Sequence, residues 1–401
     1  MLARWNPWRG LAGLPARLWL LFAVTLINRA GTMVLPFLAL WLTRERGFSA
    51  GRAGAYFALY GLTGIAAAPL AGRLADRFRP LPVLVAALLT SGAVLLVFPL
   101  ARHPAALALA VVAFAAGSET FRPASLAAIT AWTTPAERRM GFSLSRLAIN
   151  LGMSVGPAVG GFLAAWSFRA LFAVDAVTSL LAGAVLLLAA PRVPAGLAAQ
   201  APASPAAGAR RANPLTDRRF LLFLLPVALV FIVFFQHEAA MPVYLVRDLG
   251  LSPATYGLMF TVNTLLIVAL EVPLNARTAL WPFRRSLTAG ALLCGIGFGG
   301  MALAHGVPGF AATVVVWTFA EMILLPSAAA YAAHLAPGER QGSYMGAYSM
   351  IAALGFSVGP WLGLKLLDAW GGRTFWSATF VVAAVAALLF SRLVDDAAYS
   401  G

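Results

Sequence analysis

Charge and cysteine are both scarce in this sequence. Charged residues make up 11% of the chain and hydrophobic residues 61%, whereas an ordinary soluble domain carries roughly 25% charged residues. The single cysteine, Cys294, excludes an intramolecular disulfide. The four histidines lack metal-ligand spacing, and the chain has no G-x-S-x-G motif or phosphate-binding glycine loop. These absences argue against an enzyme, and neither a metal nor a cofactor is expected.

Long apolar stretches recur along the whole chain, and each matches the roughly 20 residues that a helix needs to cross the hydrocarbon of a bilayer. The sequence therefore predicts an all-α integral membrane protein with twelve transmembrane helices in two pseudosymmetric six-helix bundles. The helices are predicted near residues 18–43, 50–74, 81–101, 105–131, 142–166 and 168–190, and then near residues 219–246, 252–275, 286–305, 308–335, 343–369 and 373–393.

The predicted domains are residues 1–190, a cytoplasmic linker at 191–218 that is rich in Pro, Ala and Arg, and residues 219–401. The net charge of +15 reflects arginines that fall mostly in the loops of one side when both termini are cytoplasmic. The charge thus indicates membrane topology and not a nucleic-acid partner. Only one basic residue is a lysine, a bias typical of a GC-rich bacterial genome, so we expect a protein of the bacterial inner membrane. We also expect it to be a monomer.

The chain contains a long internal repeat. LGMSVGPAVG at residues 151–160 returns as LGFSVGPWLG at residues 354–363, a displacement of 203 residues in a chain of 401. A repeat that spans half the chain indicates two similar units. The first copy reads g-x-x-x-G-P-x-x-G-G and the second departs only at its end, where Leu364 replaces the last glycine. The residues concerned are Gly152, Gly156, Pro157, Gly160 and Gly161 in the first copy, and Gly355, Gly359, Pro360 and Gly363 in the second.

A second motif lies between the second and third predicted helices, where residues 72–80 read GRLADRFRP. Gly72, Asp76 and Arg77 stand in the spacing G-x-L-x-D-R. Together with the glycine motif, and in the same order, this segment resembles the signatures of the proton-coupled exporter branch of the major facilitator superfamily. Arg79 stands where that family usually has glycine and Pro80 where it has a basic residue, which leaves the conformation of the loop open.

The resemblance implies a secondary transporter whose first, fourth, seventh and tenth helices line a central cavity. Glycines spaced by four share one helix face and let a neighbouring helix approach closely, while Pro157 removes a backbone hydrogen bond. We expect both glycine motifs in the fifth helix of their halves, with bends at Pro157 and Pro360 and a tighter contact in the N-terminal half. Asp76 is expected to stabilise one conformation of the transporter, either by its position at a helix end or by pairing with a basic residue.

Charged residues within membrane helices are costly, at about 2.5–3.5 kcal/mol on insertion scales, and usually face a cavity or a partner. The deep ones lie in the first, fourth, seventh and tenth predicted helices, the same set that the resemblance assigns to the cavity. Candidates for a proton relay are Glu321, Glu119, Glu238 and His237, and candidates for the substrate cavity are Asn28, Arg29, Arg122, Phe121 and Trp317. Asp175 is expected at the membrane interface, near the end of the sixth helix.

Glu321 is the first choice for the proton-carrying group, because it sits halfway along its helix without a basic neighbour within a turn. Burial favours the neutral form of such a carboxyl group. The alternative is a permanently protonated side chain that only links helices. Glu119 and Arg122 are three residues apart and either pair with each other or serve the cavity. His237 and Glu238 either take up a proton or reach the headgroup region.

The sequence thus predicts a transporter driven by the proton gradient that exports small hydrophobic or drug-like compounds by alternating access. One alternative is transport of an anionic metabolite, peptide or siderophore, with Arg29 and Arg122 as the charge clamp. A second, of another class, is a non-transporting membrane receptor on the same fold. The expected partners are the substrate, protons and the lipid bilayer.

Overall fold

The computed structural model describes residues 14–190, 214–278, 281–336 and 341–393, and the predicted linker lies mostly outside this part of the chain. The described residues are helical, with no strand among them, so the protein is an all-α membrane protein. The chain divides into two compact units. The N-terminal unit comprises residues 1–34 and 63–206, and the C-terminal unit comprises residues 35–62 and 207–401.

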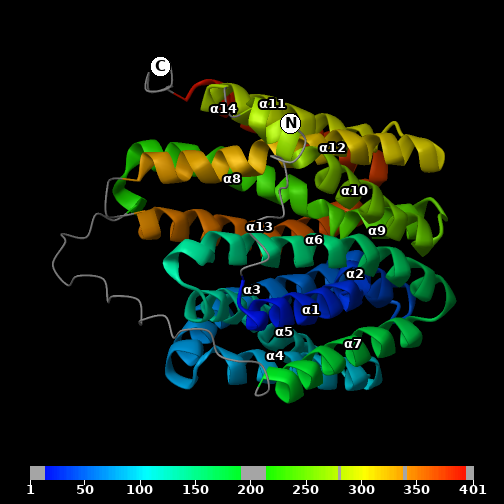
Figure 1. The fold of residues 1–401 in the computed structure, drawn as a ribbon. Helices are drawn as coiled ribbons and strands as arrows, with labels where there is room; N and C mark the ends of the chain where they lie inside the picture. The colour runs from blue at the N-terminus through cyan, green and yellow to red at the C-terminus, as the bar shows by residue number, and fades with distance from the viewer. Residues whose placement is uncertain (1–13, 191–213, 279–280, 337–340, 394–401) are drawn as a thin grey trace, which may run out of the picture. The chain divides into compact units, whose positions relative to one another are not determined.

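The helices follow the apolar stretches of the sequence (Figure 1). In the first half they are α1 (Ala16–Gly31), α2 (Val34–Arg44), α3 (Ala50–Phe78), α4 (Pro80–Val97), α5 (Pro104–Trp132), α6 (Pro135–Trp166) and α7 (Phe168–Ala189), with the short 3-10 helix η2 (Phe98–Leu100) after α4. In the second half they are α8 (Arg218–Phe234), α9 (Ala240–Val243), α10 (Pro253–Thr278), α11 (Phe283–Gly300), α12 (Gly306–Leu335), α13 (Gln341–Trp370) and α14 (Gly372–Ser391). Three short segments flank α8 and α9: the 3-10 helices η4 (Pro214–Thr216) and η5 (Phe235–His237), and the π-helix η6 (Tyr244–Asp248).

Helix packing repeats between the units. In the N-terminal unit α1 packs on α6 and α7, and α4 packs on α5 and α7. In the C-terminal unit α8 packs on α13 and α14, and α11 packs on α12 and α14. Each pair of the first half thus has its counterpart six spans later. Eleven helices of the described residues are long and apolar enough to cross a membrane, and α11, which takes the place that α4 has in the first half, completes the twelve.

Helix ends follow local chemistry. Proline stands in the first turn of α4, α5 and α6, where its missing N–H costs no hydrogen bond. Asp217 caps α8, because its Oδ1 accepts the N–H groups of Arg219 and Phe220, and its Oδ2 accepts the Tyr344 hydroxyl of α13 at 2.7 Å. Burial raises the pKa of Asp217, but these hydrogen bonds outweigh burial and hold it below its ordinary value. The cap therefore stabilises the fold at neutral pH and is lost as the pH falls through that lowered pKa.

Candidate functional site

The first membrane span, expected to be one helix, is interrupted between α1 and α2. Thr32 and Met33 leave the helix, and Asp175 of α7 meets the break. Its Oδ2 accepts the N–H groups of Met33 at 3.0 Å and Val34 at 2.9 Å, which are the unpaired donors at the start of α2. The Asp175 side chain is 4% exposed and thus buried inside the unit, while its expected place at the membrane interface stays a prediction. The two amides of the helix break supply hydrogen bonds that a buried carboxylate requires.

The seventh span is interrupted in the same way. The chain leaves α8 at Phe234, forms η5, and resumes at α9 after Ala239, whose φ of −134° and ψ of −56° are not helical. Gln236 holds the break, because its amide group donates to Ile232 O at 2.7 Å and to Gly359 O of α13 at 2.8 Å. The Tyr256 hydroxyl of α10 donates to the freed His237 carbonyl at 2.9 Å. A shift of 203 residues carries Thr32 to Phe235, so the two breaks occupy equivalent positions.

The glycine motif of α6 packs against the first break. A Cβ on Gly152 would lie 2.8 Å from Ala30 N, and one on Gly156 would lie 2.8 Å from Arg29 O and 3.1 Å from Thr32 O. Gly160 and Gly161 are buried further along the same helix. The small residues therefore let α6 touch the backbone of α1 where its hydrogen bonding ends.

The copy in α13 packs against the second break in the same manner. A Cβ on Gly355 would meet Phe231, one on Gly359 would lie 3.1 Å from Ile232 O, and one on Gly363 would overlap the Gln236 side chain. The backbone contact is thus closer in the N-terminal unit, as expected. Pro157 and Pro360 lie within α6 and α13, which continue through them.

Glu321 lies in α12, and an amide from α10 holds it. The Asn263 side chain donates to Glu321 Oε2 at 2.9 Å and to Thr318 Oγ1 at 3.0 Å. Asn263 is 7% exposed and Thr318 is fully buried. Glu321 also interacts electrostatically with His237 and Glu271. Three spans of the C-terminal unit thus bring an acid, an amide and an imidazole into one polar cluster.

His237 and Glu238 stand at the break of the seventh span. The His237 Nδ1 lies 2.6 Å from Phe234 O, so this nitrogen carries the proton and Nε2 faces Glu238 Oε1 at 3.4 Å. The pair is an ion pair when the imidazole carries protons on both nitrogens, because only then is His237 positively charged. The other carboxylate oxygen, Glu238 Oε2, is buried without a hydrogen-bond partner in the described part of the chain.

Aromatic rings surround this pair. Trp317, a candidate for the cavity wall, is 3% exposed and stacks on His237 with centroids 5.5 Å apart and on Phe298 at the same separation. Phe234 and Phe260 contact the imidazole as well, at 4.8 and 5.7 Å between centroids. The imidazole therefore lies in an apolar setting, where its charge state depends strongly on Glu238 and Glu321.

The N-terminal candidates divide into two groups. Asn28 and Phe121 line a cavity inside the unit, and the Arg29 guanidinium lies 5.8 Å from the Phe121 ring centroid. Glu119 packs against α3, since a Cβ on Gly64 would lie 2.9 Å from its Cγ. Arg122 is exposed, and no salt bridge joins it to Glu119 among the residues that the structure describes.

The loop motif ends α3 and begins α4. Gly72 and Arg77 lie in α3, with no described atom within 4 Å of a Cβ built on Gly72. The Asp76 side chain lies outside the described residues, so its predicted pairing stays a prediction. Arg79, at the usual glycine position, has φ 67° and ψ 156°, a backbone conformation that is essentially restricted to glycine. The turn between α3 and α4 therefore has a glycine-like conformation although an arginine occupies it.

Two pseudosymmetric halves of six spans each, with interrupted first and seventh spans, agree with the plan of a polytopic membrane transporter built from repeats. The sequence matches the Major Facilitator Superfamily over residues 18–246 and 238–397, and the chain belongs to this family. The family and its transporter relatives place the chain among non-enzymatic membrane transporters.

Several curated relatives align over most of the chain. The uncharacterized MFS-type transporter YqjV of Bacillus subtilis is 28% identical over 88% of this chain and 87% of its own length. A Na(+), Li(+), K(+)/H(+) antiporter of Planococcus maritimus is 26% identical over 83% and 85%, respectively. The multidrug resistance protein MdtH of Cronobacter sakazakii is 26% identical over 82% of both chains.

Solved structures share the fold. A POT family transporter in complex with 5-aminolevulinic acid superposes with a TM-score of 0.77 at 16% identity, over 94% of this chain and 95% of the other. The nucleoside transporter NupG superposes with a TM-score of 0.78 at 12% identity, over 94% and 99%. The relatives are bacterial, which agrees with a multi-pass protein of the inner membrane.

Three polar residues organise the site, Asp175, Gln236 and Asn263, and the sequence analysis names only Asp175 and gives it no role at a helix break. All three are buried. Asn263 and Gln236 are amides inside predicted membrane spans, as Asn28 is, and that position is the signal that could have found them. Asp175 was noted, but its role depends on a break in a helix 142 residues away, which no local pattern reports.

Proposed function

We propose that this transporter couples proton movement to the export of small, mostly apolar compounds, with Glu321 as the group that takes up and releases the proton. The observation that carries the proposal is the polar cluster of the C-terminal unit, where Asn263 binds Glu321 and His237 lies within electrostatic reach. A buried carboxyl favours its neutral form, and a neighbouring imidazole supplies a second acceptor for the proton.

The relatives support the type of transport. MdtH carries the name of a multidrug resistance protein, and the Planococcus protein that of an antiporter exchanging alkali cations for protons. One charge moved across 100 mV is worth about 2.3 kcal/mol, so a single proton supports a useful gradient.

The test is Glu321→Gln in proteoliposomes that contain a pH-sensitive dye. Glutamine keeps the side-chain volume and can accept the Asn263 hydrogen bond, but it cannot release a proton. We expect substrate-driven proton flux to fall at least about tenfold, with an unchanged elution profile and unfolding midpoint. Glu45→Gln, an exposed acid outside the cluster, is the matched control and should transport like the wild type. Normal coupled flux in Glu321→Gln would remove Glu321 from the relay and leave it as a structural link between α10 and α12.

An anionic substrate is the second candidate, because Arg122 is exposed and forms no ion pair with Glu119 in the described part of the chain. A panel of compounds sorted by charge, followed by thermal unfolding, separates the two. Stabilisation by apolar and cationic compounds agrees with the export proposal. Stabilisation only by carboxylates or phosphates, lost in Arg122→Gln, would replace it by anion transport. A protein without any ligand-dependent flux would be the receptor predicted as the alternative of another class.

A further inference from the structure

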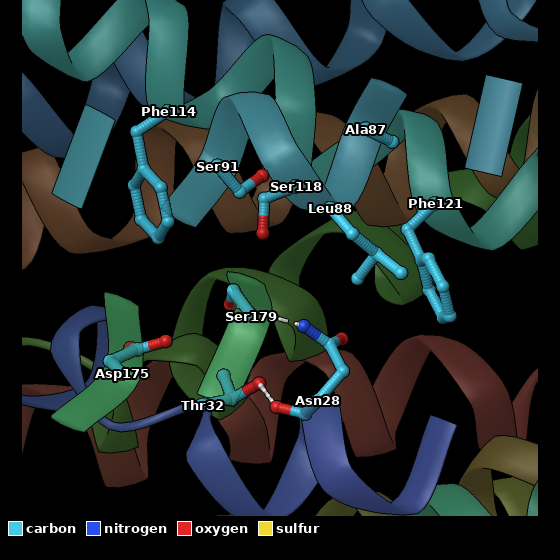
Figure 2. A pocket seen from close by; sticks show the side chains of 10 residues that line it. All are labelled: Asn28, Thr32, Ala87, Leu88, Ser91, Phe114, Ser118, Phe121, Asp175 and Ser179. Atoms are coloured by element: carbon cyan, nitrogen blue, oxygen red, sulfur yellow. Dashed lines mark hydrogen bonds between the residues drawn. The ribbon is translucent and has the colours of Figure 1, made fainter. Parts of the chain in front are cut away.

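A polar cavity lies inside the N-terminal unit, apart from the acid cluster of the C-terminal unit. Its volume is about 10 Å³, room for roughly one particle of the size of water. Figure 2 shows Ser91 and Ser118, from α4 and α5, on one side, and Asn28, Thr32, Asp175 and Ser179, from the end of α1 and from α7, on the other. Six polar side chains from four parts of the chain therefore face one small space.

Several of these groups retain unused hydrogen-bonding capacity. Ser91 is 5% exposed, and its hydroxyl forms no hydrogen bond within the described part of the chain. Asp175 uses Oδ2 for both amides of the helix break, and the described residues provide no donor to its Oδ1. Ser179 Oγ accepts only a long hydrogen bond of 3.4 Å from the Asn28 amide. A hydroxyl oxygen has two lone pairs, so Ser179 can still bind a further group. The cavity thus presents oxygens, which are the ligands that hard cations prefer.

Glycine keeps this space open. A Cβ on Gly117 would lie 2.5 Å from Ser91 Oγ and 3.2 Å from Ala87 O. The absence of a side chain at residue 117 therefore lets α4 and α5 close together while the Ser91 hydroxyl points to the cavity (Figure 2). The arrangement is built from tightly packed helices.

The charges around the cavity favour a single positive charge. Asp175 is the only acidic residue that lines it. Two groups offset part of the negative charge of Asp175. They are the two amides at the start of α2, which donate hydrogen bonds to it, and the Arg29 guanidinium, which attracts it electrostatically. Glu119 and Arg122 of α5 are the other charged groups at this depth, and α4 contributes none. This balance disfavours a divalent ion, and a carboxylate in so dry a place still benefits from a monovalent partner.

We propose that this cavity binds one alkali cation, with Na⁺ as the probe ion, ligated by the Asp175 carboxylate and by the hydroxyls of Ser91, Ser118 and Ser179. The site is separate from Glu321 and does not rest on the proposed proton coupling. Since Asp175 also caps α2, an ion on its free oxygen links cation binding to the break in the first span. Na⁺ and protons compete for the same carboxylate.

The test uses the purified full chain in detergent and its thermal unfolding midpoint, followed by the loss of helical circular dichroism. NaCl is titrated against choline chloride at constant ionic strength, with LiCl and KCl as competitors. We expect Na⁺ to raise the unfolding midpoint saturably, by about 3 °C near hundredfold saturation. Ser91→Ala should weaken the apparent affinity at least about tenfold, Asp175→Asn should abolish the response, and Glu321→Gln should keep it.

Two outcomes would overturn the site. An equal response to Na⁺ and choline would mean that the cavity holds water only. A Na⁺ response that survives in both Ser91→Ala and Asp175→Asn would place the ion elsewhere. If Asp175→Asn fails to fold, Ser91→Ala and Ser118→Ala decide the question by direct ²²Na⁺ binding. Loss of proton flux in Glu321→Gln with Na⁺ binding intact would leave both proposals standing as separate sites.

Discussion

Arg79 has a strained backbone conformation that the two flanking helices impose on it. It is the only non-glycine residue with positive φ in the described part of the chain, and it stands between the end of α3 and Pro80, the first residue of α4. A side chain in that region of φ and ψ costs about 1–3 kcal/mol, which the packing of the two flanking helices must offset.

Arg79→Gly should therefore stabilise the protein, raising the free energy of unfolding by about 1 kcal/mol, because glycine adopts this conformation without strain. Thermal unfolding in detergent measures the shift. Arg77→Gly is the matched control, since residue 77 is helical and glycine there should destabilise by about 0.5–1 kcal/mol. Equal shifts in both variants would show that Arg79 bears no strain.

At the scale of elements, the two helix breaks depend on the glycine motifs. In both units a helix loses its hydrogen bonding midway through the membrane, and a glycine face of the fifth helix covers the exposed backbone. Backbone groups at membrane depth need internal partners, which Asp175 supplies in one half and Gln236 and Tyr256 in the other. The two halves thus satisfy the backbone groups of their helix breaks with different side chains.

Gly156→Ala tests this contact. The new methyl group would lie 2.8 Å from Arg29 O, and helix backbone cannot swing aside as a flexible side chain does. We expect a loss of about 1–3 kcal/mol in the free energy of unfolding, together with slower transport. Gly346→Ala in α13, where a Cβ meets nothing within 4 Å among the described residues, should instead be neutral or slightly stabilising. A neutral Gly156→Ala would contradict the close contact.

At the scale of the whole chain, residues 35–62 belong with the C-terminal unit although residues 63–206 separate them from the rest of it. Asp368 of α13 accepts Gly51 N at 3.2 Å and the Arg247 guanidinium of η6 at 2.7 Å. The Ser357 hydroxyl of α13 donates to Ala58 O at 2.9 Å. Leu364, which replaces the last glycine of the second motif, is fully buried and packs toward Gly54. The departure from the repeat thus supplies an apolar contact to residues 35–62.

A disulfide measures this contact directly. A Cβ on Gly51 lies 3.8 Å from Lys365 Cβ, close to the mean of about 3.8 Å in disulfides. Gly51→Cys with Lys365→Cys should cross-link under mild oxidation, because both residues belong to the C-terminal unit. The chain enters the N-terminal unit at residue 63, so the link should stop transport if the proposed alternating access moves residues 35–62 away from α13. The link is detected as fragments held together after cleavage at a protease site inserted in the linker.

Each single-cysteine variant is the control for this experiment, and Cys294 is buried and gives little background. Cross-linked protein that transports at the normal rate would show that this contact persists through the whole cycle. Reduction should restore transport if the disulfide alone is responsible.

The sequence by itself predicted the number and position of the spans, the family, and the helix face on which the glycine motifs pack. Hydropathy and spacing report these features because each depends on residues within one helix. The polar cluster was partly predictable: Glu321, His237 and Glu238 stand out as ionisable groups in apolar spans, and the structure brings them into one unit.

Only the tertiary structure decided where the first and seventh spans break, what Asp175 does, how Asn263 holds Glu321, and that residues 35–62 pack with the C-terminal unit. The physical reason is the same in each case. A break in an apolar helix changes neither its length nor its composition, and it becomes stable only when a partner far along the chain satisfies the freed backbone groups.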